Sequence, residues 1–478
     1  MKELRENLLL NTDSYKASHY LQYPPKTTAV SSYIESRGGR WNRTVFFGLQ
    51  MFLKTYLETP ITQEDINEAE VFWKGHGEPF NKEGWQYILD KYDGKLPVTI
   101  QAVPEGTVVQ TGNVLVQIIN NDDNCFWLTS FLETALLRAT WYPTTVATNS
   151  WMCKKTIMDN LAKTSDDPEA EIAFKLHDFG ARGASSMETA GIGGAAHLVN
   201  FMGSDTVTGI LYAKRFYGED MAGFSIPAAE HSTMTTWGGE EGEIEAFKHM
   251  LDTFGGKYPL IACVSDSYNI WKAVEEKWPS LKEKIINSGS VLVVRPDSGT
   301  PVAVVSGVIE RLMDKFGYET NKKGFKVLPP YIRVIQGDGV KEESIKDILL
   351  EMEYRHLSGS NTAFGMGAAL LQNFDRDCLR FAMKASATKV DGVWRDVFKE
   401  PITDPGKVSK KGRLALIEVD GAYKTVREDD CSAEDNKLVV VYKDGQVVKE
   451  WEFSEIRERA NIALMGIYKA QNIILKAA

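Results

Sequence analysis

Hydrophobic and polar residues are grouped in blocks along the middle of the chain, and the clearest block is residues 291–299. Four apolar residues, mostly β-branched, run into Arg295, Pro296 and Asp297. This order predicts a buried strand that places charged side chains at its carboxyl end. Over residues 302–316, apolar positions then recur at helical spacing. The predicted unit is therefore a strand, a polar loop and a helix.

The same unit recurs through the middle third of the sequence. Apolar segments end in polar or glycine-rich motifs, and they begin at Ile172, Asp205, Phe224, Leu260, Val291, Ile332 and Thr362. Helical patterns lie between several of them, one after an expected capping box of Ser185 and Glu188 and one over residues 340–356. Strands alternating with helices predict an α/β fold, a parallel TIM-like but irregular barrel whose active site gathers these seven loops. A doubly wound open sheet is the alternative.

The pattern changes after about residue 385, where β-rich runs are separated by short turns. Three Asp-Gly pairs predict tight hairpins: Asp391-Gly392, Asp420-Gly421 and Asp444-Gly445. We expect an antiparallel sheet here that joins N-terminal strands in a flanking β-rich domain, followed by a closing helix from about Ser454. The predicted domains are residues 1–165 and 386–478 for the two parts of the flanking domain, and 166–385 for the barrel. A further helix is expected over residues 125–140.

Composition narrows the class of protein. A formal charge of −10 argues against a dedicated nucleic-acid or membrane-surface binder, although a local basic pocket is compatible with it. The five cysteines are scattered without CxxC spacing, so neither a disulfide framework nor a zinc site is indicated. The first residues do not resemble a secretory leader, and no apolar run reaches transmembrane length. We therefore expect a cytoplasmic protein.

Acidic residues stand at the ends of several predicted strands, in loops that should converge. Carboxylates so placed can bind Mg²⁺ or ribose hydroxyls, or stabilise a developing cation. Helix N-capping is the simpler explanation, and for Asp266 it is as good as the functional one. Asp297, beside Arg295 and before a glycine, is the better functional candidate. The four residues are Asp205, Asp266, Asp297 and Asp338.

Arginines and glycines supply candidate phosphate sites. Arg182, Arg295 and Arg376 can bind phosphate through paired donors. The sequence GMGAA at residues 365–369 leads into LLQNF like a phosphate-binding turn at a helix N-terminus. A second run, GIGGAA at 191–196, lies inside a helical pattern, which favours close helix packing over a dinucleotide site.

His231 follows an apolar segment and should face the same pocket as the aspartates, as a proton carrier or a nucleophile towards phosphate. His177 and His197 are interpreted as structural. Phe179 and Tyr15 lie near charged loops, where either could stack on a flat heteroaromatic ring. The residues alone therefore indicate a barrel enzyme that handles a phosphorylated sugar with Mg²⁺.

Several long motifs carry a resemblance to a known family. They are TDSYKASHYLQYPP, HDFGARGASSMETAGIGGAAHLVNF, SIPAAEHST, SDSYNI, RPDSG, LPPYIRVIQGDGV and SKKGRLAL. In this order, from about residue 8 to about residue 415, the sequence resembles the nicotinamide phosphoribosyltransferase family of type II phosphoribosyltransferases.

The resemblance implies an activity: nicotinamide and 5-phosphoribosyl-1-pyrophosphate would give nicotinamide mononucleotide and pyrophosphate in NAD salvage. It also implies Mg²⁺, a homodimer with shared active sites, and ATP as a coupling substrate that phosphorylates His231. Phe179 would stack on one face of the pyridine ring, and the partner subunit's Tyr15 would cover the other. Asp205 would accept a hydrogen bond from the carboxamide NH₂ and repel the carboxylate of nicotinate.

The resemblance assigns the remaining site residues by their match to family motifs. Around pyrophosphate, ribose and Mg²⁺ these are Arg182, His231, Asp266, Arg295 and Asp297; at the ribose hydroxyls, Gly337 and Asp338; at the 5′-phosphate, Gly367, Ala368 and Arg376; at the phosphates of ATP, Arg37, Lys384, Lys399 and Lys407. Asp13 would reach the neighbouring subunit together with Tyr15.

Two positions depart from the family pattern. Met366, Ala368 and Ala369 replace part of a glycine run, which would leave a slightly tighter phosphate turn if no positive φ is required there. Ala262 replaces a hydroxyl-bearing residue near the ring. Two alternatives stay open: the same reaction on nicotinate, and a non-catalytic metabolite-binding protein on the same fold.

Overall fold

The structure is a computed structural model that describes residues 7–403 and 407–471. The chain forms two compact units. The first contains the described residues up to Thr148, with Phe216–Gly218 and Phe374–Ala460. The second contains Asn149–Arg215, Glu219–Asn373 and the described residues from Asn461 onward. Three helices have residues assigned to each unit: α5 (Glu133–Thr164), α8 (Val207–Tyr217) and α17 (Phe453–Ala470).

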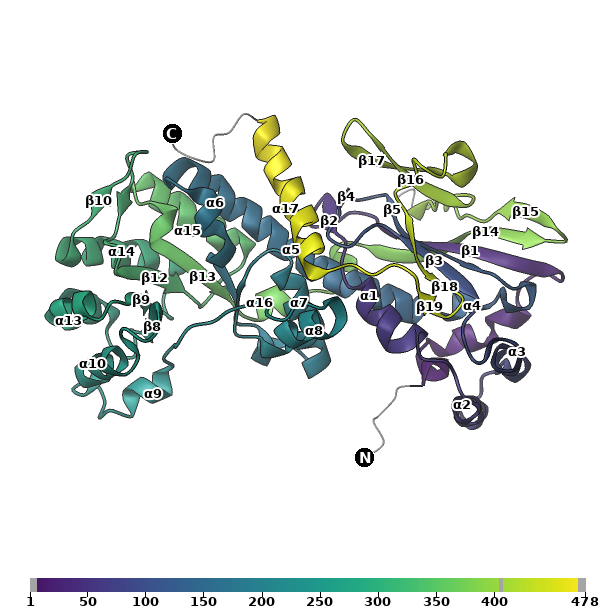
Figure 1. Ribbon diagram of the computed structural model, residues 1–478, viewed down its shortest axis with the longest axis horizontal. Coiled ribbons are helices and arrows are strands. Elements are labelled where there is room, and N and C mark those ends of the chain that lie inside the picture. Colours follow the sequence, from purple (N-terminus) through teal and green to yellow (C-terminus); the bar gives the residue numbers. More distant parts are fainter. Residues whose placement is uncertain (1–6, 404–406, 472–478) are drawn as a thin grey trace. The chain divides into compact units, whose positions relative to one another are not determined.

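A seven-stranded antiparallel sheet forms the centre of the first unit (Figure 1). Its order is β15-β14-β1-β5-β3-β18-β19, so N-terminal and C-terminal strands share one sheet, as the sequence predicted. The long strand β1 is almost wholly buried and lies between β14 and β5. The strands are β1 (Thr27–Ser36), β3 (Val98–Ala102), β5 (Val114–Asn120), β14 (Phe381–Val390), β15 (Val393–Asp396), β18 (Val439–Lys443) and β19 (Gln446–Val447).

The three predicted Asp-Gly hairpins are confirmed. Each aspartate and each glycine has positive φ, as in the pair 54° and 76° at Asp391 and Gly392. Both central residues of a type I′ turn need this conformation, and Asp-Gly adopts it readily. The turns join β14 to β15, β18 to β19, and the separate pair β16 (Leu414–Val419) and β17 (Ala422–Arg427). Another small pair joins β2 (Arg43–Val45) to β4 (Val108–Gln110).

Short helices of the first unit bury aromatic side chains. Trp73 of α2 and Trp85 of α3 are among the largest fully buried residues. The Trp85 ring packs edge-on against those of Trp127 and Phe131, at centroid distances of 4.8 and 5.1 Å. These helices are α1 (Leu49–Phe52), α2 (Gln63–His76), α3 (Lys82–Tyr92) and α4 (Leu128–Phe131). The helices predicted over residues 125–140 and from about Ser454 are confirmed by α4 with α5 and by α17.

A six-stranded parallel sheet forms the second unit, in the order β7-β6-β13-β12-β9-β8. Its strands are β6 (Leu176–Asp178), β7 (Gly203–Ser204), β8 (Leu260–Val264), β9 (Val291–Arg295), β12 (Ile332–Gln336) and β13 (Thr362–Met366). This order follows the chain cyclically and has no reversal point, which distinguishes it from a doubly wound sheet.

The predicted TIM-like barrel is found only as a half-barrel. The predicted segment that begins at Phe224 is no regular strand. It makes two isolated bridges, one from Phe224 to Gly203 and one from Ala228 to Ala262. Pro227, in the middle of this segment, has no backbone N–H to donate, and only its carbonyl pairs, with the Ala262 N–H at 2.9 Å. A regular ladder therefore does not form between the two edge strands.

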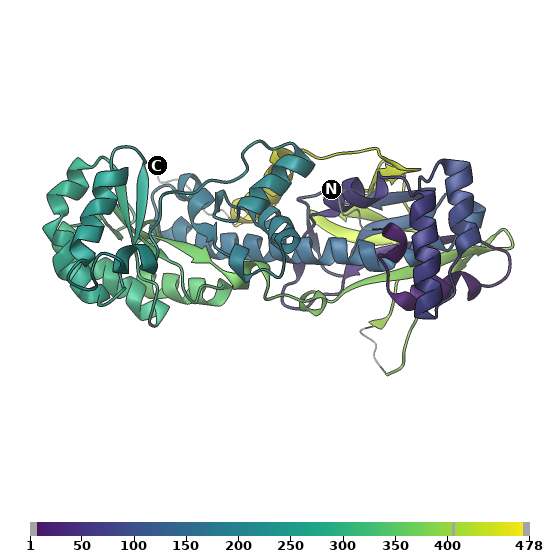
Figure 2. The same cartoon turned by 90° about the horizontal axis from the view of Figure 1, so that it is seen from below.

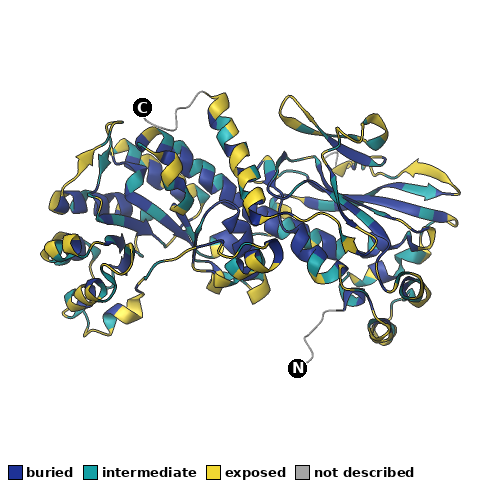
Figure 3. Cartoon of the chain, in the orientation of Figure 1, coloured by how far each residue is buried: buried dark blue, intermediate teal, exposed yellow. Residues whose placement is uncertain are grey.

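Helices flank the strands of the half-barrel (Figures 1 and 2), and the strands themselves are largely buried (Figure 3). On α14 the apolar positions expected over 302–316, among them Val305, Ile309 and Leu312, are all buried. The helices are α6 (Pro168–Glu171), α7 (Met187–Leu198), α9 (His231–Thr235), α10 (Glu243–Phe254), α11 (Ile270–Lys272), α12 (Trp278–Ser280), α13 (Lys282–Asn287), α14 (Pro301–Phe316), α15 (Glu342–Tyr354) and α16 (Ala368–Leu371). A small hairpin joins β10 (Glu319–Thr320) and β11 (Lys326–Val327).

Helix α7 corrects one prediction and confirms another. Its N-cap is Ser186, whose Oγ accepts a hydrogen bond from the Thr189 N–H at 3.1 Å, so the capping box expected at Ser185 and Glu188 is wrong by one residue. The GIGGAA run packs closely, as predicted: a Cβ on Gly194 would lie 2.9 Å from the Cα of Gly209 on α8. Within residues 7–403 and 407–471, no helix has the length and apolar character needed to cross a bilayer.

Candidate active site

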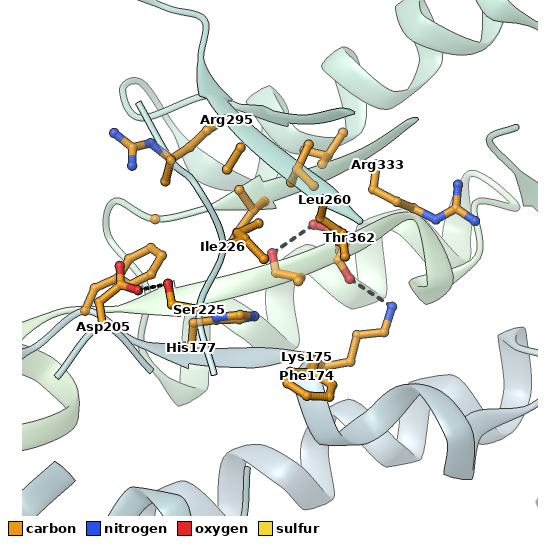
Figure 4. Close-up of a pocket in the computed structure, with 18 of the residues that line it drawn as sticks. Phe174, Lys175, His177, Asp205, Ser225, Ile226, Leu260, Arg295, Arg333 and Thr362 are labelled. Carbon is orange, nitrogen blue, oxygen red and sulfur yellow. Dashed lines mark hydrogen bonds between the residues drawn. The ribbon is translucent and has the colours of Figure 1, made fainter. Parts of the chain in front are cut away.

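A cavity of about 1320 Å³ lies in the second unit and runs along the inner face of the half-barrel. At one end it is lined by the polar loops that follow the strands, including Asp205, His231, Arg295 and Asp297. At the other end it reaches Phe174, Lys175 and Arg333 (Figure 4). The carboxyl ends of parallel strands are the usual place for an active site on such a fold.

The two-residue period of the strands decides which side chains reach the cavity. Along β6, Lys175, His177 and Phe179 line it, whereas Leu176 and Asp178 are buried elsewhere. Along β9 and its loop, Val293, Arg295 and Asp297 do the same. His177, interpreted as structural from the sequence, is therefore a cavity residue. Its position two residues before Phe179 is the signal that could have revealed it.

The part of the cavity around Phe179 and Asp205 has the form of a site for a flat polar ring. Ser225 donates a hydrogen bond to Asp205 Oδ1, and the His177 imidazole lies close by (Figure 4). Burial lowers the pKa of His177, while the nearby Asp205 carboxylate opposes this effect. Ser225 did not figure among the predicted residues. An aromatic face beside an oriented carboxylate can bind a ring that carries an N–H donor.

Two glycines let neighbouring strands approach the Phe179 ring. A Cβ on Gly365 would lie 1.9 Å from a ring carbon of Phe179, too close for any other residue. A Cβ on Gly337 would lie 3.5 Å from the same ring and 3.1 Å from Asp297 Oδ1. The predicted site residue Gly337 therefore keeps the space between the ring and this carboxylate open.

His231, the first residue of α9, is connected to the acidic loops. Its Nε2 lies 2.9 Å from Asp266 Oδ1, and the other oxygen of Asp266 accepts hydrogen bonds from the Asp297 N–H at 2.9 Å and from Ser298 Oγ at 2.5 Å. Burial raises the pKa of Asp266, but these hydrogen bonds together hold it below its ordinary value. Asp266 is thus an ionised partner of His231. It is not a helix N-cap, because Asn269 caps the next helix.

Arg295 and Asp297 lie side by side at the end of β9, with 3.7 Å between Arg295 Nε and Asp297 Oδ1. Arg295 Nε is buried and has no hydrogen-bond partner among the described residues. A guanidinium with an unpaired donor beside a carboxylate is suited to hold a phosphate group while the carboxylate faces a positive centre.

The remaining predicted residues of this unit lie near the same rim. Arg182 is exposed in a short 3-10 helix, Ala181–Gly183, and lines the cavity with Asp338 and Gly367. Gly367 precedes Ala368, but α16 is only four residues long, so the predicted phosphate-binding helix is a single turn. Gly367 has a φ of −83°, and no positive φ occurs at Met366, Ala368 or Ala369, so the alanines cause no strain.

Seven predicted site residues lie in the first unit and are placed there by its own elements. Asp13 accepts a hydrogen bond from Thr134 Oγ1 at 2.7 Å, and Tyr15 is 55% exposed. Arg376 pairs with Asp377 at 3.1 Å, and Lys407 is exposed. The remaining three are Arg37, Lys384 and Lys399.

These last three cations gather in one place. Burial lowers the pKa of Lys384, and Lys16, Arg37 and Lys399 add to this effect through their charges, while Glu133 opposes it. Arg37 Nε pairs with Glu35 at 3.0 Å, but its Nη2 is buried without a hydrogen-bond partner among the described residues. Such a cluster is suited to bind an anion with several phosphates.

The acidic residues do not form a metal cage. In the described ranges, no group of three or more His, Cys, Asp and Glu side chains could hold a metal ion. Both oxygens of Asp266 are occupied by hydrogen bonds, so Asp297 is the freer carboxylate. This donor set fits a Mg²⁺ ion that arrives bound to a pyrophosphate, because Mg²⁺ keeps several waters and typically takes only one or two protein carboxylates.

Comparisons with known proteins agree with this geometry. Residues 174–446 match the model of the nicotinate phosphoribosyltransferase (NAPRTase) family, and residues 7–100 match the nicotinamide phosphoribosyltransferase N-terminal domain. A nicotinamide phosphoribosyltransferase of Xanthomonas campestris pv. campestris is 51% identical, over 96% of this chain and 99% of its own. One from Acinetobacter baylyi is 32% identical, over 95% and 97%.

Solved structures share the fold. The human nicotinic acid phosphoribosyltransferase aligns with a TM-score of 0.59 at 17% identity, over 95% of this chain and 94% of its own. A nicotinate-nucleotide pyrophosphorylase from Pyrococcus furiosus aligns with a TM-score of 0.62 at 17% identity, over 99% and 100%. The class is thus that of the phosphoribosyltransferases, which are enzymes. The chain belongs to the nicotinate phosphoribosyltransferase (NAPRTase) family, and the relatives that it matches over nearly its full length are nicotinamide phosphoribosyltransferases.

Proposed function

We propose that this enzyme transfers the phosphoribosyl group of 5-phosphoribosyl-1-pyrophosphate to nicotinamide, giving nicotinamide mononucleotide and pyrophosphate in NAD salvage. The observation that carries the proposal is the Asp205 carboxylate, which Ser225 orients beside Phe179 in the cavity. The names of the relatives that are 51% and 32% identical support the same substrate.

Asp205 is the proposed source of base selectivity. A carboxylate can accept a hydrogen bond from the NH₂ of nicotinamide, and it repels the negative charge of nicotinate. Nicotinate is the second candidate base, because the matching family is named for it. The cations that line the described cavity lie on other elements than Asp205; they are Lys175, Arg182, Arg295 and Arg333. The group to which Ser225 donates its hydrogen bond is the anionic carboxylate of Asp205.

The reaction we infer is a displacement at the anomeric carbon. The ring nitrogen forms a bond to C1 as the bond from C1 to the pyrophosphate oxygen breaks, and the electron pair leaves with pyrophosphate. Positive charge develops on the sugar in the transition state, and we assign its stabilisation to Asp297, which lines the cavity beside Arg295. Arg295 and Arg182 would neutralise the leaving group. Asp297, with Asp266 nearby, would hold a Mg²⁺ ion directly or through water and pyrophosphate, and the ion would neutralise charge on the leaving group.

ATP coupling is a further part of the proposal. His231 is exposed at the cavity rim, with Asp266 holding its Nε2. Such a histidine can accept the γ-phosphoryl group of ATP at its other ring nitrogen as the bond to the bridging oxygen breaks and ADP leaves, with Asp266 stabilising the imidazolium. We propose Arg37, Lys384, Lys399 and Lys407 as ligands of the ATP phosphates. A homodimer would bring Tyr15 and Asp13 of the partner subunit to the ring.

The test is product formation from 5-phosphoribosyl-1-pyrophosphate and Mg²⁺, with nicotinamide or nicotinate in parallel and with or without ATP. Wild type should form the mononucleotide from nicotinamide alone. Asp205→Asn, which removes the charge, should lower the ratio of kcat/KM for nicotinamide to kcat/KM for nicotinate by at least about tenfold. The matched control is Asp347→Asn, on the exposed side of α15, which should keep the preference. His231→Asn should abolish the stimulation of turnover by ATP.

A preference for nicotinate in the wild type would keep the reaction but overturn the role of Asp205. Formation of no mononucleotide from either base would overturn the proposed reaction. Equal stimulation by ATP in wild type and His231→Asn would overturn the coupling role of His231 and leave the base preference untouched.

A further inference from the structure

Asp178, a residue outside the predicted site, connects the two loops that form the ring pocket. Its Oδ1 accepts a hydrogen bond from the Gly180 N–H at 2.7 Å, directly after Phe179. Its backbone carbonyl accepts one from the Asp205 N–H at 2.9 Å. One residue therefore fixes the start of the Phe179 turn and the position of Asp205, although its own side chain does not line the cavity.

The side chain of Asp178 is fully buried and has an unsatisfied oxygen. Neither its Oδ2 nor the buried hydroxyl of Thr206 has a hydrogen-bond partner in the described structure that meets normal geometry, yet the hydroxyl is close enough to lower the pKa of the carboxyl. Burial outweighs this effect and raises the pKa of Asp178 to about 7. A carboxyl so placed is about half protonated near neutral pH and largely neutral below it, because burial disfavours its charged form.

Asp205 supplies the charge that acts on this carboxyl. In the sheet Asp178 pairs with Ser204 of β7 and Met366 of β13, both uncharged, and Leu371 of α16 covers Gly180. The charge of Asp205 raises the pKa of Asp178 further. His177 lies on the opposite face of the strand, towards the cavity, and Arg182 is exposed. Ionisation of Asp178 would therefore place a second anion beside the one that is proposed to bind the carboxamide.

The proton on Asp178 changes the charge of the site more than its geometry. A neutral carboxyl can donate to Thr206 Oγ1 and accept from the Gly180 N–H, while a carboxylate can accept from both groups. Asparagine offers the same donor and the same acceptor as the neutral acid. Asp178→Asn is thus a fixed copy of the protonated state.

We propose that Asp178 is a positioning residue that must be protonated for tight binding of nicotinamide. Its ionisation places a second negative charge beside Asp205, and a bound ring that excludes water strengthens the repulsion between the two carboxylates. The inference rests on the proposed function, and it adds a pH dependence of base binding. The sign follows from linkage: if the protonated form binds better, affinity is full at low pH and falls as the pH rises through the pKa of Asp178.

The test is calorimetric titration of the full-length enzyme with nicotinamide between pH 6 and 9, where nicotinamide itself does not titrate. For wild type the dissociation constant should rise about fivefold or more across this range. Near neutral pH, titrations in buffers of different ionisation enthalpy should show net uptake of a fraction of a proton. Asp178→Asn should bind at all pH values as tightly as wild type does at pH 6, without this uptake. Asp347→Asn, the surface control, should behave as wild type.

A wild type that binds nicotinamide with constant affinity and no proton uptake would overturn the inference and leave the proposed function intact, and no variant is needed for that result. Equal pH dependence in wild type and Asp178→Asn would overturn it too, since another group would then titrate. A wild type that neither binds nicotinamide nor forms its mononucleotide would instead overturn the proposed function, and this inference with it.

Discussion

At the scale of single residues, the site is built by pairs in which one group orients another. Ser225 donates to Asp205, Asp266 holds His231, and Asp178 fixes the turn after Phe179. In each pair, one residue orients a partner that faces the reacting groups in the proposed reaction. The orienting residue restricts the rotamers of its partner, and so the pocket is formed before a substrate enters it.

Ser225→Ala tests the first of these pairs. The substitution frees Asp205 from its hydroxyl donor, and the carboxylate should then turn away from the position that the carboxamide needs. We expect kcat/KM for nicotinamide to fall about five- to twentyfold, mainly through KM, as for the loss of one hydrogen bond to a charged group. The measurement is steady-state kinetics with each substrate varied. An equal rise in KM for 5-phosphoribosyl-1-pyrophosphate would contradict the assignment, because Ser225 would then support the whole site.

At the scale of elements, local signals predicted most of what local forces determine. The Asp-Gly turns and the unit of β9 and α14 follow from backbone preferences and periodicity, and both occur as expected. The half-barrel could not be foreseen in this way, because the failure of residues 224–229 to pair regularly depends on Pro227 lying opposite β8. His177 was misread for a related reason: its face became known only with the register of β6.

The packing of α7 on α8 gives an element-scale prediction. At Gly194 the Cα of Gly209 leaves no space for a side chain, so Gly194→Val should force the helices apart and destabilise the second unit by about 2–4 kcal/mol. The control is Gly466→Ala on α17, where a Cβ meets no atom within 4 Å and helix propensity should add about 0.5–1 kcal/mol. Urea unfolding followed by circular dichroism compares them, and a neutral Gly194→Val would show that the helices can separate freely.

At the scale of the whole molecule, the residues assigned to the proposed function are divided between the two units. Phe179, Asp205, His231 and Asp297 belong to the second unit, whereas Tyr15 and the cation cluster of Arg37, Lys384 and Lys399 belong to the first. Either unit alone therefore lacks part of the proposed machinery. The family resemblance predicted both sets, because it rests on long motifs spread along the chain. Spacing along one chain gives no position for groups that a partner subunit would supply.

Mixed dimers test whether sites are shared between subunits. Tyr15→Ala should damage the part that a chain contributes to the site of its partner, and Asp297→Ala should damage the cavity of the chain that carries it. In a heterodimer of these two chains, one site would combine an intact cavity with an intact Tyr15 and the other would lack both. Random mixing places half of the dimers in this class, so activity should recover to about a quarter of wild type. Affinity tags on each chain verify the mixing.

Asp266→Ala mixed with Asp297→Ala is the control, because both changes lie in the same unit and neither chain can complement the other. Recovery in the first mixture alone establishes sharing, and no recovery in verified heterodimers means that each subunit completes its own site.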